Sequence, residues 1–326
     1  MSASRLTQVA HGLVQVKISM SYPLRWVNSY VLYGSSGVVI VDPGPRSSSS
    51  EQEWISTMKE LGLSWGDIQE VFVTHHHPDH YGLAGWIQKH AKCRVSMSRR
   101  AHQESELMWG KSSGITSELI AMFEDNGMPL EWTAQLPEHF DSFLPQVTPR
   151  AEVTYLEDKA EVEMGNQIWC AIQTGGHAPG HLSFFQKESR LLLCGDAVLP
   201  QISPNVSLVP GSDPEPLQTF LISLQQLSAL EVDLSLPGHR NPFSHFQERT
   251  EALILHHEER LNKIAAYLEH EPRTGFELCV FLFGTKLGVH QMRFAMCEAL
   301  AHIQELKRQG RAAGQLINGL VRYISI

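Results

Sequence analysis

Four histidines and an aspartate occur within seven consecutive residues, 74 to 80, whose sequence is THHHPDH. In an extended or turning loop, His75 and His77 lie on the same side of the backbone, whereas His76 points away. This spacing can deliver two imidazole nitrogens to one ion, and imidazole is a common zinc ligand. We therefore predict a metal site that includes His75 and His77, and we do not expect His76 to be a ligand.

Pro78 lies in the middle of this loop and bends the chain after the two spaced histidines. The bend lets Asp79 and His80 face a neighbouring second position, where a carboxylate oxygen and an imidazole nitrogen both suit zinc. Two ions need further ligands, and turns that contain glycine let the backbone approach a metal closely. The candidates in such turns are His177 and His181 in GGHAPGH, Asp196 in CGDA and His239 in PGH.

Short apolar runs that end abruptly in polar or turn residues must position these side chains. The runs are GVVIVDPG (37–44), EVFVTHHH (70–77), RLLLCGD (190–196) and EVDLSLPGH (231–239). Each is typical of a buried strand that leads into a loop. Helical patterns such as SSEQEWISTMKELGL lie between them, as in a layered α/β protein, and ligands of such folds collect where strands end. Asp42, His75, Asp196 and His239 all lie just beyond these runs.

Two segments depart from this alternation of strand and helix. Residues 98–150 contain helix-like stretches rich in Met, Trp and Phe, separated by Gly and Pro, and we interpret them as an insertion. The aromatic and methionine side chains expected there are Met97 at its edge, Met108, Trp109, Met122, Phe123, Met128, Trp132, Phe140 and Phe143. Residues 251–326 carry long helical patterns, which predict a small C-terminal helical module after a main domain of residues 1–250.

Composition indicates a globular protein without membrane spans. The 326 residues are 42% hydrophobic, which suffices for one large core and a small accessory module. No run approaches the roughly 18 to 20 apolar residues that cross a bilayer, and the N-terminal stretch lacks a basic region followed by an apolar one. The five cysteines are odd in number and widely spaced, as expected for reduced thiols. We therefore expect a cytoplasmic protein with no membrane partner.

The motifs HHHPDH, VDPG, APGHLSF, CGDA and PGH, in this order, resemble the metallo-β-lactamase superfamily of hydrolases over residues 10–245. The resemblance implies an αββα sandwich. It also implies that the inserted residues 98–150 border the metal cleft, where they would form a lid over the substrate. The segment from RLNKIAAYLEH to HIQELKRQGRA resembles the winged-helix-like module that follows the hydrolase domain in mitochondrial endoribonuclease-like relatives. Related modules in bacterial hydrolases support packing or dimerisation, so a homodimer is one expected assembly.

The resemblance also implies a set of ligands for two zinc ions. By resemblance, His75, His77 and His181 hold one zinc, Asp79, His80 and His239 hold the other, and Asp196 bridges the two. Asp42 would orient a ligand histidine, and His177 would be a turn residue or a neighbour of the ligands. Imidazole and carboxylate ligands also accept iron or manganese.

Departures from other branches of the superfamily narrow the expected activity. Enzymes of this fold that hydrolyse β-lactams typically have Arg or Ser in place of His80, or Cys in place of Asp196, so antibiotic hydrolysis is not expected. Diiron flavoproteins have Glu in place of His77. Nucleases with a long clamp insertion are disfavoured, because 43 positions separate Asp196 from His239. The chain resembles the glyoxalase II, acyl-homoserine lactonase and small endoribonuclease branches.

These motifs predict a dinuclear zinc hydrolase of a small ester, thioester or lactone. Two zinc ions about 3.5 to 4 Å apart can share a water and lower its pKa toward 7, so that a bridging hydroxide attacks the substrate, with Asp79 as the catalytic carboxylate that orients it. The alternatives are a phosphodiesterase or endoribonuclease acting on single-stranded RNA, and a metal-binding regulatory protein without turnover. A small-molecule partner is preferred over nucleic acid because the net charge is −9. A basic channel continuous with Lys307, Arg308 and Arg311 would favour RNA instead.

Overall fold

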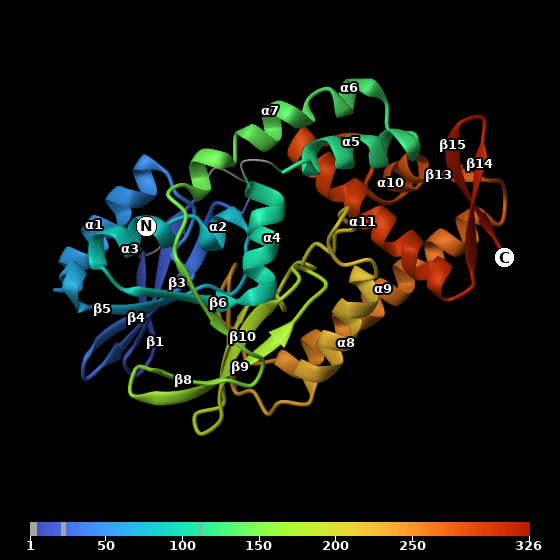
Figure 1. Ribbon diagram of the computed structural model, residues 1–326. Coiled ribbons are helices and arrows are strands. Elements are labelled where there is room, and N and C mark those ends of the chain that lie inside the picture. Colours follow the sequence, from blue (N-terminus) through green and yellow to red (C-terminus); the bar gives the residue numbers. More distant parts are fainter. Residues whose placement is uncertain (1–4, 21–23, 111–112) are drawn as a thin grey trace.

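Two β-sheets stack face to face in the computed structural model, which describes residues 5–20, 24–110 and 113–326 (Figure 1). The first sheet has seven strands in chain order: β1 (Leu6–Ala10), β2 (Leu13–Ser19), β3 (Trp26–Gly34), β4 (Gly37–Val41), β5 (Ile68–Phe72), β6 (Arg94–Ser98) and β7 (Val153–Leu156). The second sheet has five strands in the order β12 (Leu234–Pro237), β11 (Leu191–Gly195), β10 (His181–Gln186), β9 (Gln167–Thr174) and β8 (Glu161–Met164).

Strand direction brings several strand ends to one edge of the sandwich. Strands β4 to β7 pair in parallel, as do β11 and β12, whereas the other neighbours within these two sheets are antiparallel. Parallel neighbours need crossover connections. Helices supply most of these crossovers: α1 (Ser48–Glu60) with the short η1 (Trp65–Asp67), α2 (Pro78–Tyr81) with α3 (Ala84–Ala91), and α8 (Pro216–Ser228). The loops that begin these connections therefore meet at the carboxyl ends of the strands.

Alternation of buried side chains explains the layers. In β4, Val39 and Val41 belong to the apolar cluster between the sheets, together with Trp169 and Phe184 of the second sheet. The intervening residues of β4 pack on the other side, in the cluster that contains Trp54 of α1. Because both faces of β4 are buried, helices must cover the outside of the sheet. Helix α8 covers the outer face of the second sheet (Figure 1), and the predicted αββα sandwich is confirmed.

Helices fill the segment between β6 and β7, as the sequence predicted. They are α4 (Arg99–Trp109), α5 (Ile115–Asp125), α6 (Leu130–Thr133), α7 (Leu136–Asp141) and η2 (Leu144–Val147), and residues 111 and 112 of the predicted lid lie outside the described part. Part of this segment packs against the C-terminal region: the Tyr323 hydroxyl donates to Asn126 Oδ1 at 2.7 Å. Phe123 and Met128 are buried in the core and do not line the cavity described below, in contrast to the expected lid.

The C-terminal region combines helices with a small sheet. Its elements are α9 (Phe246–Leu268), β13 (Arg273–Thr274), α10 (Gly275–Phe283), α11 (Val289–Arg308), β14 (Ala312–Ile317) and β15 (Leu320–Ser325). The helical patterns of residues 251–326 predicted the helices but not the small sheet, whose strand order is β13-β15-β14. Asn318 and Gly319 both have positive φ between β14 and β15, which matches the Asn-Gly signature of a tight hairpin.

All five cysteines are free, and Cys194, Cys279 and Cys297 are buried, in agreement with reduced thiols. Within residues 5–20, 24–110 and 113–326, no helix has both the length and the apolar character that a membrane span requires.

Candidate metal centre

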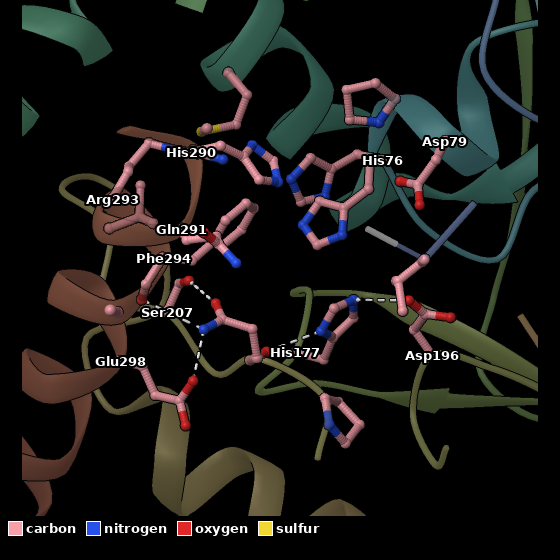
Figure 2. A pocket seen from close by; sticks show the side chains of 18 of the residues that line it. His76, Asp79, His177, Asp196, Ser207, His290, Gln291, Arg293, Phe294 and Glu298 are labelled. Carbon is pink, nitrogen blue, oxygen red and sulfur yellow. Dashed lines mark hydrogen bonds and ion pairs between the residues drawn. The ribbon is translucent and has the colours of Figure 1, made fainter. Parts of the chain in front are cut away.

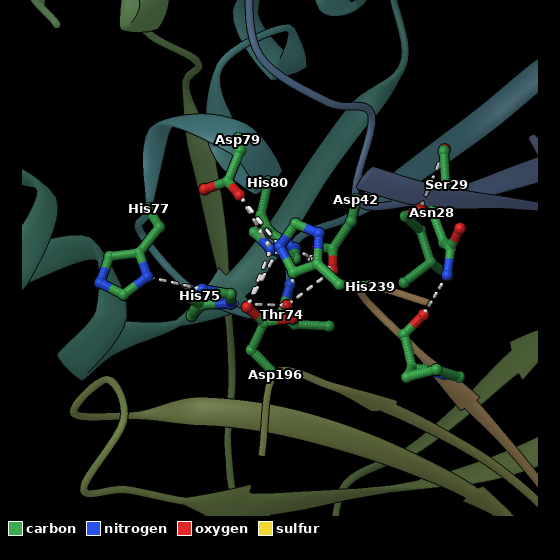
Figure 3. A network of polar contacts seen from close by, with 12 residues as sticks. Asn28, Ser29, Asp42, Thr74, His75, His77, Asp79, His80, Asp196 and His239 are labelled. Carbon is green, nitrogen blue, oxygen red and sulfur yellow. Dashed lines mark hydrogen bonds and ion pairs between the residues drawn. The ribbon is translucent and has the colours of Figure 1, made fainter. Parts of the chain in front are cut away.

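The candidate ligands come from loops at the carboxyl ends of strands in both sheets and from the short helix α2, which contains Asp79 and His80 (Figure 3). Asp42 follows β4, and the loop 74–77 follows β5 and leads into α2. His77 is the residue that precedes α2 and Pro78 occupies its first turn, where the missing amide hydrogen costs nothing. Asp196 follows β11 and His239 follows β12. The turn between β9 and β10 supplies His177, so both sheets contribute to one cluster.

The carboxylate of Asp42 holds the loop 74–77 in place. Its Oδ1 accepts from the backbone amide of Thr74 at 2.7 Å, and its Oδ2 accepts from the Thr74 hydroxyl at 2.7 Å. The same Oδ2 lies 2.8 Å from Nδ1 of His80. Asp42 is buried and has a φ of 53°, a conformation that costs free energy in a residue other than glycine. The resemblance implied such an orienting role for Asp42, and the contact with His80 gives it a geometric basis.

Four histidines share one orientation, in which Nδ1 lies within hydrogen-bond distance of an acceptor. The acceptors are Thr74 Oγ1 for His75 at 2.9 Å, Asp42 Oδ2 for His80 at 2.8 Å, the Asn205 carbonyl for His177 at 2.8 Å and the Trp26 carbonyl for His239 at 3.0 Å. Because the Thr74 hydroxyl donates to Asp42, its lone pair is free to accept from His75. A neutral imidazole that donates from Nδ1 has its lone pair on Nε2. All four Nε2 atoms are thereby prepared to bind a cation.

One group of nitrogens gathers around His75. Its Nε2 lies 3.0 Å from Nδ1 of His77 and 3.3 Å from Nε2 of His177. These three atoms belong to a set whose mutual distances would suit a metal ion. Burial and the neighbouring imidazoles hold the pKa of His75 and the pKa of His77 well below the usual value. The group therefore consists of neutral imidazole rings whose nitrogen lone pairs can bind a cation.

A second group combines carboxylates and imidazoles. Nε2 of His239 lies 3.1 Å from Oδ2 of Asp79 and 3.4 Å from Oδ2 of Asp196. Nε2 of His80 lies 3.7 Å from Asp79 Oδ2 and 3.5 Å from Asp196 Oδ2. The same oxygen of Asp196 is 3.7 Å from Nε2 of His177. Asp196 thus lies between the two groups and is placed to serve both.

The charges of the second group balance in the metal-free protein. Burial would lower the pKa of His80, but Asp196, Asp79 and Asp42 outweigh it and raise that pKa well above the usual value. Burial would also lower the pKa of His239, but Asp196 and Asp79 outweigh this effect and raise the pKa to about 10. Burial would raise the pKa of Asp196, yet His239 and His80 hold it well below its usual range. The buried carboxylates therefore require positive charge, which metal cations can supply in place of protons.

Unsatisfied polar atoms support the fit to metal ions. Within the described residues, Nε2 of His80 and Oδ1 of Asp196 are buried and lack a hydrogen-bond partner. Such atoms are costly unless something satisfies them, and a cation would satisfy both. A side chain at Gly238 would collide with Asp196 Oδ1 and with the His80 ring, so this position needs glycine. Imidazole and carboxylate donors fit zinc, and they also accept iron or manganese.

His181 does not join this cluster, in contrast to the prediction. Its Nδ1 lies 3.0 Å from Thr174 Oγ1, and its Nε2 accepts from the backbone amide of Asp196 at 3.1 Å. A side chain on Gly195 would lie 2.5 Å from the same Nε2. Both ring nitrogens are thus used to hold the Asp196 loop. The geometry exchanges the predicted roles: His177 faces His75 and His77, and His181 supports the loop.

The ring of His76 lies 4.8 Å from the ring of His77 and 6.5 Å from the ring of His75. The backbone carbonyl of His76 accepts from Nε1 of Trp109 at 3.2 Å. Its ring is buried, and burial lowers the pKa of His76 to about 3, which makes it a neutral imidazole at physiological pH. Among the described residues it belongs to none of the candidate metal groups, but it lines the adjoining cavity (Figure 2).

A cavity of about 670 Å³ opens onto the cluster. Asp79, Asp196 and His177 lie at one end of it, and apolar side chains form much of the remaining wall (Figure 2). Those side chains include Met108, Trp109 and Phe143 from the segment before β7, and Phe283, Leu287 and Phe294 from the C-terminal region. The sequence did not predict the C-terminal contribution. No motif marks it, because it combines Phe283 at the end of α10, Leu287 in the following loop and both apolar and polar side chains of α11.

The predicted basic cluster lies elsewhere. Lys307, Arg308 and Arg311 are not among the described residues that line the cavity. Arg308 Nη2 is 2.7 Å from Glu305 Oε1, and Arg311 donates to Asn262 Oδ1 at 2.8 Å. Within the described residues, the cavity wall therefore does not extend to this basic cluster.

Comparisons with known proteins agree with the motifs and the fold. The family model described as the metallo-beta-lactamase superfamily matches residues 23–239, and that of a metallo-beta-lactamase-like C-terminal domain matches residues 261–326. A probable metallo-hydrolase of Bacillus subtilis, YqjP, is 21% identical over 304 residues, which cover 91% of this chain and 92% of the relative.

Two solved structures match over nearly the whole chain. A metallo-beta-lactamase family protein from Thermus thermophilus is 31% identical, with a TM-score of 0.88, and the match covers 98% of this chain and 100% of that protein. A beta-lactamase domain protein from Burkholderia ambifaria is 28% identical, also with a TM-score of 0.88, and the match covers 98% and 94% of the two chains. The similarity therefore includes the C-terminal region.

Proposed function

Because this chain belongs to the metallo-beta-lactamase superfamily and is a metallo-hydrolase, we propose that it uses two zinc ions to hydrolyse an ester, thioester or lactone. Two ligand groups that open onto a largely apolar cavity support this proposal. Asp196 Oδ2 lies 3.7 Å from Nε2 of His177 in one group, and 3.5 Å from Nε2 of His80 and 3.4 Å from Nε2 of His239 in the other. The paired groups favour two ions, and the cavity favours a substrate with an apolar part.

The geometry favours a definite distribution of ligands. His75, His77 and His177 would hold one ion, Asp79, His80 and His239 would hold the other, and Asp196 would contribute to both. Two metal ions at such a site supply Lewis acidity and lower the pKa of water toward about 7. Asp42 and the carbonyls of Trp26 and Asn205 keep the histidine rings oriented, and such neighbours of ligands affect metal affinity and activity.

Asp79 is the chain's best candidate for handling a proton. It lines the cavity and keeps 19% of its side chain exposed, whereas the Asp196 side chain is 7% exposed. Its Oδ2 is held 3.1 Å from His239 Nε2, which fixes the carboxylate at the cavity end. From there it would orient an attacking water and accept the proton that the water loses.

The shape and lining of the cavity favour an acyl substrate over RNA. Ligand cavities of roughly 300 to 1,000 Å³ suit small molecules, and this one lies within that range. A polyanionic backbone requires several cationic contacts, yet Lys307, Arg308 and Arg311 do not line the described cavity. The net charge of −9 also disfavours the binding of a polyanion such as RNA.

An activity panel tests this proposal. Zinc-loaded protein is assayed against matched thioester, ester and lactone substrates, a phosphodiester and single-stranded RNA, and the Asp79→Ala variant serves as the control for contaminating activity. We expect kcat/KM for at least one acyl class to exceed that for RNA, and the activity to be lost in the control. Efficient, strongly salt-sensitive RNA cleavage beside negligible acyl hydrolysis would favour the endoribonuclease function instead.

A further inference from the structure

A chain of polar contacts connects the metal cluster to the C-terminal helices. Nδ1 of His177 donates to the backbone carbonyl of Asn205 at 2.8 Å. The side-chain amide of Asn205 donates to Glu298 Oε2 at 2.7 Å and to the Phe294 carbonyl at 3.3 Å, and both acceptors belong to α11. Glu298 in turn pairs with Arg260 of α9. Figure 2 shows His177, Ser207 and Glu298 along this path.

Asn205 depends on these contacts for its position. It lies in the segment between β11 and α8, outside any helix or strand. Its Oδ1 accepts from the Ser207 hydroxyl at 2.5 Å, so every group of its side-chain amide is engaged. The backbone amide of Leu208 also donates to the Cys297 carbonyl of α11 at 3.1 Å. Helix α11 therefore determines where the Asn205 carbonyl lies.

Glu298 is placed to fix this arrangement. It is 6% exposed, and burial raises its pKa despite the opposing effects of Arg260 and Asn205. A buried carboxylate requires charged or polar partners, and removing one partner of such a pair is strongly destabilising. The Arg260 guanidinium also lies 5.0 Å from the centre of the Phe283 ring, which restricts its position further. The ion pair thus holds α9, α11 and the Asn205 segment together.

We propose that Glu298 is a positioning residue for the metal site: it fixes Asn205, whose carbonyl sets the tautomer and ring orientation of His177. This inference rests on the proposed role of His177 as a metal ligand. An acceptor held at Nδ1 keeps the lone pair on Nε2 and directs it toward the ion, and the loss of such contacts typically lowers metal affinity or activity by roughly 10- to 100-fold. The C-terminal region would then contribute to metal binding as well as to the cavity wall.

Zinc affinity is the measurement that tests this role, because it does not depend on turnover. The dissociation constants of both zinc ions are determined by competition with a chromophoric chelator, for the wild type and for Glu298→Ala, Glu298→Gln and Asn205→Ala. We expect Glu298→Ala and Asn205→Ala to weaken one of the two ions by roughly 10- to 100-fold. Glu298→Gln should lose less affinity than Glu298→Ala, because its amide oxygen can still accept from Asn205, although its NH2 group cannot accept from Arg260.

Glu305→Ala is the matched control. Glu305 lies on the same helix, is 3% exposed and pairs with Arg308, but it makes none of the described contacts with Asn205. It should lower the melting temperature of the metal-free protein without changing zinc affinity. Equal losses of affinity in Glu305→Ala and Glu298→Ala would overturn the inference, because they would reflect general destabilisation.

His177→Ala separates this inference from the proposed function. If His177→Ala weakens zinc binding and Asn205→Ala does not, the positioning role is wrong and the ligand assignment stands. If His177→Ala leaves both zinc ions bound with unchanged affinity, the ligand assignment itself is wrong. Asn205→Ala keeps the Glu298–Arg260 pair, so it decides the question even if Glu298→Ala fails to fold.

Discussion

The Nε2 atoms of His177 and His75 lie 3.3 Å apart at the centre of the candidate metal site. Each ring donates from Nδ1, to the Asn205 carbonyl and to Thr74 Oγ1, so neither Nε2 carries a proton when the imidazoles are neutral. Two lone pairs at this distance repel each other unless a cation lies between or beside them. The relationship identifies His177 as a candidate ligand, although the sequence motif had suggested His181.

The two histidines of GGHAPGH should respond differently to substitution. His177→Ala should reduce bound zinc by about one equivalent, because it removes a lone pair from the group around His75. His181→Ala should keep the zinc and lower the free energy of unfolding by about 1 to 3 kcal/mol, because the buried Asp196 amide loses its acceptor. Metal analysis and urea unfolding of both variants are the measurements. The opposite pattern would restore the ligand assignment implied by the resemblance.

Asp79→Ala should reduce turnover far more than stability. The substitution removes a ligand of the second group and the carboxylate that orients water, so we expect kcat to fall by at least about 100-fold. His76→Ala is the matched control within the same loop and should keep its metal content. Because the His76 ring lines the cavity, a change in KM is the expected effect. Equal metal content and equal rates in the two variants would show that the ligands within this loop are wrongly assigned.

The sequence predicted the sandwich because the sandwich depends on local patterns. Apolar runs that end in polar residues mark strand ends, and the candidates Asp42, His75, Asp196 and His239 were predicted from those positions. The choice between His177 and His181 could not be made from spacing, since both lie in the same glycine-containing turn. It depends on tertiary contacts, because the Asp196 amide occupies Nε2 of His181.

The C-terminal contribution to the cavity also escaped prediction. Phe283 at the end of α10, Leu287 in the loop that follows and Phe294 of α11 form no sequence motif, and only the packing of the C-terminal region against the main domain brings them to the cavity. The predicted lid was partly wrong for a similar reason. Phe123 and Met128 are buried where α5 and its following turn meet the C-terminal region, so apolar composition alone does not distinguish a lid from an interface.

A series of acyl-chain lengths should reveal the apolar cavity. Burial of each additional methylene contributes about 0.8 kcal/mol, which corresponds to about a fourfold increase in kcat/KM per methylene until the cavity is full. Ala295 lines the cavity from α11, and Ala295→Trp should lower kcat/KM for long chains more than for acetyl substrates. Leu255→Trp, at a position 54% exposed on α9, is the control. No dependence on chain length would contradict an apolar acyl site.

A buried histidine pair far from the metal ligands in sequence should make stability depend on pH. Nδ1 of His257 lies 3.0 Å from Nε2 of His302, and Nδ1 of His302 donates to the Glu298 carbonyl. Burial lowers the pKa of His257 to about 2 and the pKa of His302 to about 3. In the unfolded chain both histidines have a pKa of about 6.5. The unfolded chain therefore binds more protons below that pH, and stability falls as the pH falls toward about 3.

Urea unfolding of chelator-treated protein at pH 7.5 and 5.5 measures this effect. We expect the pair to account for about 1 to 3 kcal/mol of the loss between these two values. The double variant His257→Leu/His302→Leu should show a correspondingly shallower dependence, since all other titrating groups are retained. Equal losses in the wild type and the double variant would mean that the pair is not responsible.

Zinc stoichiometry tests the central claim most directly. Protein purified without chelator, and again after incubation with excess zinc and removal of unbound metal, is analysed for metal content per chain. The two ligand groups that share Asp196 predict close to two equivalents, and iron or manganese in place of zinc would change the identity of the metal without changing this number. A value of one that added zinc does not increase would contradict the dinuclear site.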